Sequence, residues 1–144
     1  MVRQDAAHEI AGSCLAFRIR VINRALTRLY DEALRDFGVT VAQVNLLVAT
    51  TVRGPLRATD LGALLSIERS TLSRNLERLR SLGLVEDVPG DDGRSQPLRT
   101  TAAGRKLLDR MLPTWRKAQA EAEDLLGSSL ASRLDGALRR VRQR

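Results

Sequence analysis

The chain has 144 residues, of which 43% are hydrophobic and 28% charged, and its formal net charge is +7 at pH 7. This composition is typical of one folded domain or compact subunit, and no apolar run approaches the roughly 20 residues that a membrane-spanning helix requires. A single cysteine excludes an intrachain disulfide framework. Because the N-terminus also lacks a signal-peptide pattern, we expect a cytoplasmic protein.

The first predicted element is one long helix from about His8 to Asp36. Its apolar residues recur at alternating steps of four and three, the spacing of a coiled-coil seam. The seam consists of Leu15, Ile19, Ile22, Leu26, Leu29 and Ala33. A helix of this length with an unpaired apolar seam needs a partner.

Gly38 is predicted to end the first helix, and Thr40 to cap the next one, which runs to just before Pro55. Four apolar residues are expected on its buried side: Val41, Val44, Leu47 and Val48.

Two short helices joined by a tight turn follow. Thr59 is a candidate N-cap for the first helix. The inner side of this helix carries three leucines: Leu61, Leu64 and Leu65. Ser66 and Ile67 leave a turn of the length that a helix-turn-helix uses.

The second short helix has one apolar and one polar side when its residues are placed about 100° apart around the axis. A narrow stripe holds Leu72, Leu76 and Leu79, while the opposite face and its edges hold Ser70, Ser73, Arg74, Glu77, Arg78 and Ser81. Short hydroxyls can reach phosphates or base edges, and arginine can bind guanine. We interpret this face as a DNA recognition surface; the alternative is a solvated helix face.

A strand–turn–strand pattern follows Gly83, which is placed to end the second short helix. Leu84, Val85 and Val88 predict a strand, and residues 89–93 predict a polar turn. A hairpin that follows a recognition-type helix and carries Arg94 near its tip is a wing.

Thr101 can cap a helix whose apolar residues extend to Leu126. Pro113 lies inside it and predicts a kink near Leu112, because proline removes one backbone hydrogen bond and clashes with the preceding turn. Gly127 and the two serines after it break the chain. The last helix is striped by Leu130, Leu134, Leu138 and Val141.

These residues resemble the MarR family of bacterial transcription regulators, over essentially the whole chain. The wing signature of the family is Asp, any residue, Arg, five further residues and then Leu-Thr. Asp92, Arg94 and Thr101 match it, whereas Thr100 stands at the Leu position; Gly104 also fits the family. A further departure is Glu68, which stands where a short residue often opens the recognition helix.

The resemblance implies a mostly α fold with a small antiparallel β wing. Residues 37–101 would form a winged helix-turn-helix, flanked by an N-terminal dimerisation helix in 1–36 and C-terminal dimerisation helices in 102–144. It also implies that Leu56 and Arg57 form a very short strand beside the wing. Two winged domains of a homodimer would then face two half-sites of an inverted-repeat operator.

The expected DNA-binding residues lie on the second short helix and in the wing. They are Arg69, Ser70, Thr71, Ser73, Arg74, Arg78, Asp92 and Arg94. By resemblance, Arg94 enters the minor groove and Asp92 helps to hold it. Bulk charge does not identify this surface, because residues 54–105 hold eight arginines against seven acids; local placement of the arginines does.

Cys14 is a candidate redox sensor. It lies on the predicted first helix, at a place similar to that of the sensing cysteine in the organic-hydroperoxide branch of the family. A thiolate near Arg18 could be oxidised to a sulfenic acid. The alternative is a small buried hydrophobe. That branch typically pairs its cysteine with tyrosines, whereas the only tyrosine of this helix is the distant Tyr30.

No residue set argues for catalysis, because one histidine and one cysteine provide no zinc spacing and no assembled nucleophile. We therefore expect no enzyme activity, no metal and no cofactor. The first hypothesis is a homodimeric, sequence-specific regulator of transcription, usually a repressor in this family, modulated by a small-molecule effector or an oxidant. The alternative is a winged-helix protein-interaction module. Arg74 and Arg94 discriminate between them, because protein docking needs no groove-reading arginines.

Overall fold

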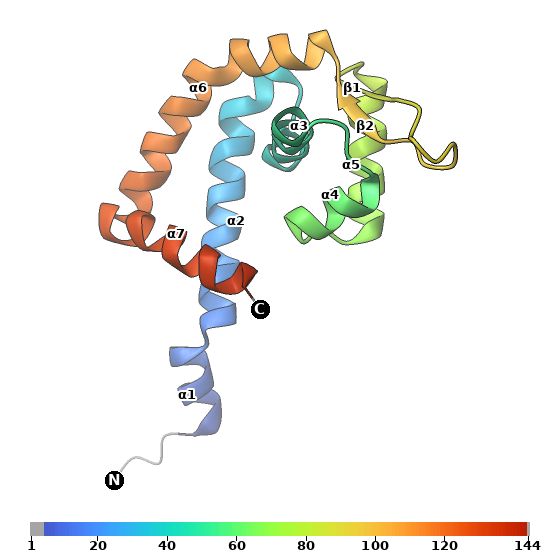
Figure 1. Cartoon of the computed structure of the whole chain (residues 1–144). Helices are drawn as coiled ribbons and strands as arrows, with labels where there is room; N and C mark the ends of the chain where they lie inside the picture. The colour runs from blue at the N-terminus through green and yellow to red at the C-terminus, as the bar shows by residue number, and fades with distance from the viewer. Residues whose placement is uncertain (1–4, 144) are drawn as a thin grey trace.

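The computed structural model describes residues 5–143; the first four residues of the predicted segment 1–36, and Arg144 at the end of 102–144, lie outside it. The helices and strands, in chain order, are α1 (Ala6–Ser13), α2 (Leu15–Leu34), a 3-10 helix η1 (Arg35–Phe37), α3 (Val41–Arg53), α4 (Ala58–Leu65), α5 (Arg69–Ser81), β1 (Val85–Asp87), β2 (Leu98–Thr100), α6 (Ala102–Leu126) and α7 (Ser128–Arg142). The fold is mostly α with a small antiparallel wing, as predicted (Figure 1).

Helix α3 lies at the centre of the core. Thr40 caps it as predicted: its hydroxyl accepts from the N–H of Gln43 at 3.3 Å, and the Gln43 side chain accepts from the N–H of Thr40 at 3.1 Å. The predicted buried side was only partly right, because Val48 is 41% exposed while Leu46 is fully buried. Helices on several sides pack against α3, so its burial does not follow one stripe.

The N-terminal helix is not continuous, so the prediction of one helix from His8 to Asp36 was wrong. Cys14 has extended backbone angles and separates α1 from α2. The residues before it favour a break, because Gly12 and Ser13 have low helix propensity and the Ser13 hydroxyl donates to the carbonyl of Glu9 at 2.6 Å.

The end of α2 is tighter than predicted. The α-helix stops at Leu34, which is fully buried, and the 3-10 helix η1 continues to Phe37. Gly38 then adopts the left-handed conformation, with a φ of +72°, and ends the element as predicted.

Helix α4 begins two residues earlier than predicted. Its N-cap is Arg57, so the prediction that Thr59 caps it was wrong. The reason is the preceding residue: Leu56 exchanges two backbone hydrogen bonds with Leu98, of 3.1 and 2.8 Å, so the helix starts as soon as the chain leaves this bridge. The predicted short strand is therefore this single bridge.

The tight turn after α4 and the end of α5 follow the predicted positions. Ser66 adopts the left-handed conformation in the turn, with a φ of +52°. After α5, the N–H of Gly83 donates to the carbonyl of Arg80, and that of Leu84 donates to the carbonyl of Leu79. This pair of bonds is a Schellman motif, and it uses the positive φ of Gly83.

The wing is a two-stranded antiparallel hairpin in which Val85 pairs with Thr100 and Asp87 with Leu98. Val88 was predicted to be part of the strand but lies just after β1, although its N–H still donates to the carbonyl of Pro97 at 2.8 Å. Thr100 is buried, and its hydroxyl lies 2.9 Å from that of Thr51. A buried threonine is accommodated at the Leu position of the family pattern because its hydroxyl has a partner.

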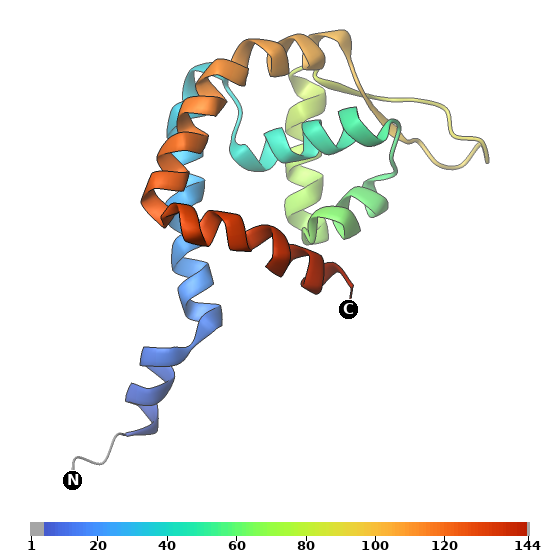
Figure 2. The same cartoon turned by 60° about the vertical axis from the view of Figure 1, so that its left-hand side comes forward.

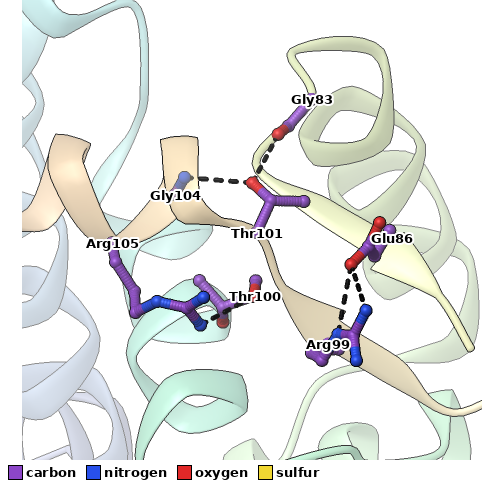
Figure 3. Close-up of polar contacts among 7 residues, drawn as sticks. All are labelled: Gly83, Glu86, Arg99, Thr100, Thr101, Gly104 and Arg105. Carbon is purple, nitrogen blue, oxygen red and sulfur yellow. Dashed lines mark hydrogen bonds and ion pairs between the residues drawn. The ribbon is translucent and has the colours of Figure 1, made fainter.

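The junction between the wing and α6 is closely packed. The Thr101 hydroxyl accepts from the N–H of Gly104 at 3.1 Å and donates to the carbonyl of Gly83 at 2.6 Å, so the predicted cap is confirmed (Figure 3). A Cβ on Gly104 would lie 2.4 Å from the carbonyl oxygen of Leu84. This position therefore requires glycine, and it docks the start of α6 onto the end of the α5–β1 connection.

The remaining helices extend from this core, to which the first half of α6 contributes Leu107 and Met111. Helix α6 packs along α2 and is bent, with Pro113 inside it; its backbone remains helical throughout (Figure 1). Gly127 separates it from α7, as predicted. Figure 2 shows α1 extending away from the body and α7 crossing beside α2. Of the helices in residues 5–143, none is long and apolar enough to cross a membrane.

We predict that Gly104→Ala destabilises the fold by about 3 kcal/mol, because the added methyl must displace backbone. Gly136→Ala is the matched control: its Cβ would meet only arginine side-chain atoms, at 3.5 Å or more, so the higher helix propensity of alanine should stabilise α7 by up to about 1 kcal/mol. Urea denaturation at one protein concentration measures both changes. Equal stability of the two variants would contradict this account of the junction.

Candidate nucleic-acid interface

Helix α5 turns its apolar side inward and its polar side outward, as predicted. Leu72, Leu76 and Leu79 are 6%, 2% and 0% exposed. The predicted contact residues of this helix are all exposed: Arg69, Ser70, Thr71, Ser73, Arg74 and Arg78. The N-cap of the helix, Glu68, forms no capping hydrogen bond with its side chain, in keeping with the departure from the family pattern at this position.

The tip of the wing is organised by one carboxylate. Asp92 Oδ1 accepts from the N–H of Arg94 at 3.1 Å, the N–H of Ser95 at 2.9 Å and the Ser95 hydroxyl at 2.8 Å. The resemblance implied that Asp92 helps to hold Arg94, and the contact is with its backbone N–H. The guanidinium-bearing side chain of Arg94 lies at the exposed tip.

Two glycines make this tip possible. Gly93 has a φ of +67°. Gly90 donates its N–H to the carbonyl of Ser95 at 3.0 Å, and a Cβ on Gly90 would lie 2.4 Å from the Ser95 hydroxyl oxygen. The loop therefore closes tightly behind Arg94, so this side chain is presented on an ordered turn.

The hydrogen bonds to Asp92 also affect its titration. They hold its pKa at about 2, with the backbone N–H of Ser95 as the largest cause, followed by the Ser95 hydroxyl and the N–H of Arg94. Asp92 is therefore ionised throughout the physiological pH range.

Three acids of the wing, Glu86, Asp87 and Asp92, form ion pairs with arginines of the wing and its neighbours. Arg99 binds Glu86 at 2.7 Å, Arg80 binds Asp87 at 2.9 Å, and Arg57 binds Asp92 at 3.0 Å; Figure 3 shows the first of these pairs. Four arginines of the predicted contact surface form no ion pair within residues 5–143: Arg69, Arg74, Arg78 and Arg94. This surface thus offers positive charge although the segment is nearly neutral.

Sequence reasoning missed the arginines that pair with the acids. Arg99 could have been found, because the hairpin register places it opposite Glu86. Ser95 could also have been suspected as a partner of an Asx turn. Arg57 lies 35 residues from Asp92, and no local pattern indicates that contact.

A cavity of about 590 Å³ lies between the long helix and the helix-turn-helix. It is lined by α2, α3 and the turn between α4 and α5 through Asn23, Leu26, Thr27, Tyr30, Val41, Ala42, Asn45, Leu65, Ser66 and Ile67. Burial, and to a lesser degree the charge of Glu123, raises the pKa of Tyr30. Its hydroxyl donates to Gln119 Oε1 on α6, so this residue connects the cavity wall to a second helix.

The structure places Cys14 in the break between α1 and α2, and not on a helix as predicted. The thiol is free and half-buried. The guanidinium of Arg18, which the redox hypothesis placed near the thiolate, donates a hydrogen bond to the carbonyl of Gly12.

The chain is similar in sequence and in structure to known transcriptional regulators. A model of the MarR family matches residues 37–95, which extend from before α3 into the wing. The E. coli K12 multiple antibiotic resistance protein MarR is 28% identical over 93 residues, which are 64% of this chain and 65% of that protein.

Solved structures cover more of the chain. The M. tuberculosis transcriptional regulator MosR is 34% identical, with a TM-score of 0.76 over 91% of this chain and 96% of that one. The same regulator in complex with DNA is 33% identical, with a TM-score of 0.71 over 90% and 99%. A mutant of E. coli MarR complexed with operator DNA is 25% identical, with a TM-score of 0.80 over 95% and 98%.

We predict that Asp92 titrates at about 2, well below its ordinary value of 3.8. Because the pKa is lowered in the folded state, the contribution of Asp92 to wing order is present above pH 3.8 and is lost as the pH falls through about 2. Ser95→Ala, which removes one donor, should raise this pKa towards the ordinary value. Carbon-13 NMR of the carboxyl group measures both; an unshifted wild-type Asp92 would refute the hydrogen-bonded tip.

Proposed function

Because the chain belongs to the MarR family of winged-helix transcriptional regulators, we propose that it is a homodimeric repressor that binds an inverted-repeat operator in double-stranded DNA. Members of this family are DNA-binding regulators and not enzymes. The observation that carries the proposal is that the arginines on the outward face of α5, and Arg94 of the wing, are exposed and have no carboxylate partners among the described residues.

The two parts of this surface suit different grooves. Arg74 lies on the face of α5 opposite the buried leucines, so its side chain would enter the major groove, where arginine can read guanine. Arg94 would enter the minor groove, where width and negative potential attract arginine. Ser70, Thr71 and Ser73 have short hydroxyls suited to phosphates or base edges. Arg69 and Arg78 complete the surface, and Asp92 orders the wing.

We infer that residues 1–36 and 102–144 supply the dimer interface and that residues 37–101 form the DNA-binding domain. Large apolar side chains of these terminal segments are exposed in the single chain: Ile10, Leu15, Phe17, Ile19, Val21, Leu125, Leu130, Leu134, Leu138 and Val141. They include the start of the predicted α2 seam and the whole α7 stripe. A second copy that covers them would remove this apolar surface from water.

A symmetric dimer can place its two copies of α5 on one face of the assembly, related by the two-fold axis. Each copy would then read one half-site, with the half-sites about one helical turn apart, which is why the operator is proposed to be an inverted repeat. An exposed Arg74 together with an exposed Arg94 favours DNA over the alternative of a protein-docking winged helix.

We propose that a small-molecule effector binds in the 590 Å³ cavity. The cavity is bounded on one side by α2, which belongs to the proposed dimer interface, and on the other by the turn that leads into α5. A ligand there would contact both the dimer helix and the recognition helix-turn-helix. A redox role of Cys14 stays a prediction, and the contact of Arg18 with Gly12 gives it no support.

We predict that Arg74→Ala and Arg94→Ala impair DNA binding in different ways. Arg74→Ala should weaken the operator much more than random DNA, because an arginine–guanine pair contributes about 1–3 kcal/mol of discrimination. Arg94→Ala should weaken binding more evenly and remove any preference for A·T-rich flanks. Titration of both variants on operator and scrambled duplexes measures these losses.

The titrations require one fixed salt concentration, because salt alone changes the affinity strongly. Selection of bound fragments from genomic DNA by the purified protein supplies the operator sequence. If Arg74→Ala lost affinity equally on both duplexes, this side chain would contact only the backbone, and the proposed recognition face would be wrong.

We predict that Leu134→Glu dissociates the dimer, because it places a charge on the α7 stripe that the partner would bury. Val52→Glu is the control, since Val52 is equally apolar and 75% exposed but lies on α3, outside the proposed interface. Sedimentation at micromolar concentration should give a dimer for the wild type and the control, and a monomer for Leu134→Glu. A monomeric wild type would overturn the proposed assembly.

A further inference from the structure

The segment between α3 and α4 holds the wing at two points. Leu56 exchanges two backbone hydrogen bonds with Leu98 at the base of the hairpin. The next residue, Arg57, binds Asp92 at the tip, with 3.0 Å between a guanidinium nitrogen and Oδ2. Among residues 5–143, this is the one hydrogen bond or ion pair that joins the tip loop, residues 89–96, to the body of the domain.

We propose that Arg57 is a positioning residue for DNA recognition: by holding Asp92, it sets where Arg94 lies relative to the recognition helix α5. The proposal rests on the proposed function, in which Arg94 enters the minor groove.

The two carboxylate oxygens of Asp92 bind different partners. Oδ1 accepts the backbone N–H groups of Arg94 and Ser95, and Oδ2 takes the guanidinium of Arg57. One carboxylate therefore links the turn that carries Arg94 to the body of the domain.

The other end of this link is fixed. Arg57 is the N-cap of α4, and its carbonyl accepts from the N–H of Leu61 at 3.0 Å. Leu61 is fully buried, and Gly62 on the same helix allows close packing with Leu72 of α5. The backbone of Arg57 is thereby held in a defined relation to α5.

An exposed ion pair usually contributes little, because two flexible side chains must be ordered to form it. Here the carboxylate is already ordered by three hydrogen bonds from the loop, which also hold the pKa of Asp92 at about 2. Of the two side chains, only that of Arg57 must therefore be ordered when the pair forms. Figures 1 and 2 show the loop projecting from the body, so even a weak link restricts where its tip can lie.

The test compares Arg57→Ala, Asp92→Asn and the double variant with the wild type. Asp92→Asn keeps an oxygen acceptor for the loop but removes the charge that binds Arg57. The matched control is Arg99→Ala, which removes one arginine and one exposed ion pair, with Glu86, from the strands of the same hairpin. Arg57→Lys keeps the charge and should retain much of the function.

Two readouts are measured. The first is affinity for operator duplexes with A·T-rich or G·C-rich flanks at the wing position, at several salt concentrations. Arg57→Ala and Asp92→Asn should each reduce the preference for A·T-rich flanks roughly two- to fivefold, the size of an exposed ion pair, and the double variant should lose no more than either. Arg99→Ala should keep the preference.

The second readout needs no DNA. Nitrogen-15 relaxation of the Arg94 and Ser95 amides should show greater mobility in Arg57→Ala than in the wild type and in Arg99→Ala. Thermal unfolding should be nearly the same in all variants, because the pair orders the loop without supporting the core.

Three outcomes overturn the proposal. Unchanged amide mobility in Arg57→Ala would show that the pair does not order the tip. Additive losses in the double variant, with an even loss on all duplexes and a weaker salt dependence, would show that Arg57 contacts phosphate directly. An unchanged flank preference would show that tip order does not matter for recognition. If the wild type bound no operator, the proposed function would fail, while amide mobility would still decide whether Arg57 holds the wing.

Discussion

The burial of three leucines along α5 is the interaction on which the arrangement of the site depends. Leu72, Leu76 and Leu79 can all reach the core only in one rotation of the helix, so their burial determines which residues face outward. The Schellman motif at Gly83 then fixes the direction in which the chain leaves α5 towards the wing. Gly104 allows the start of α6 to pack against the carbonyl oxygen of Leu84. The proposed recognition face and the wing are therefore positioned by packing within the chain itself.

The charge of the proposed DNA-binding surface depends on which acids and arginines form ion pairs, more than on the net charge of the segment. Glu86, Asp87 and Asp92 each bind an arginine that lies outside the proposed contact set. These pairs are exposed and contribute little stability, about 0–1 kcal/mol each. Their consequence is local: they neutralise three acids of the wing, while the arginines of the proposed DNA surface have no carboxylate partner among residues 5–143.

The features that could be predicted from the sequence are those determined by neighbouring residues. Capping by Thr40 and Thr101, the leucine stripe of α5 and the glycines that end helices each follow from local chemistry. The failures have a different cause. Val48 is exposed because tertiary packing overrides the stripe of α3, and the break at Cys14 follows from several small preferences acting together.

The least predictable contact is also the one that connects distant parts of the domain. Arg57 and Asp92 meet because the bridge between Leu56 and Leu98 aligns the α3–α4 connection with the hairpin, which no local pattern reveals. This places the two ends of α4 in different surroundings: Leu65 lines the cavity beside α2, whereas the N-cap touches the wing. If the proposed effector displaced α4 as a rigid body, the displacement would reach the wing tip through Arg57 as well as reaching α5 through the turn.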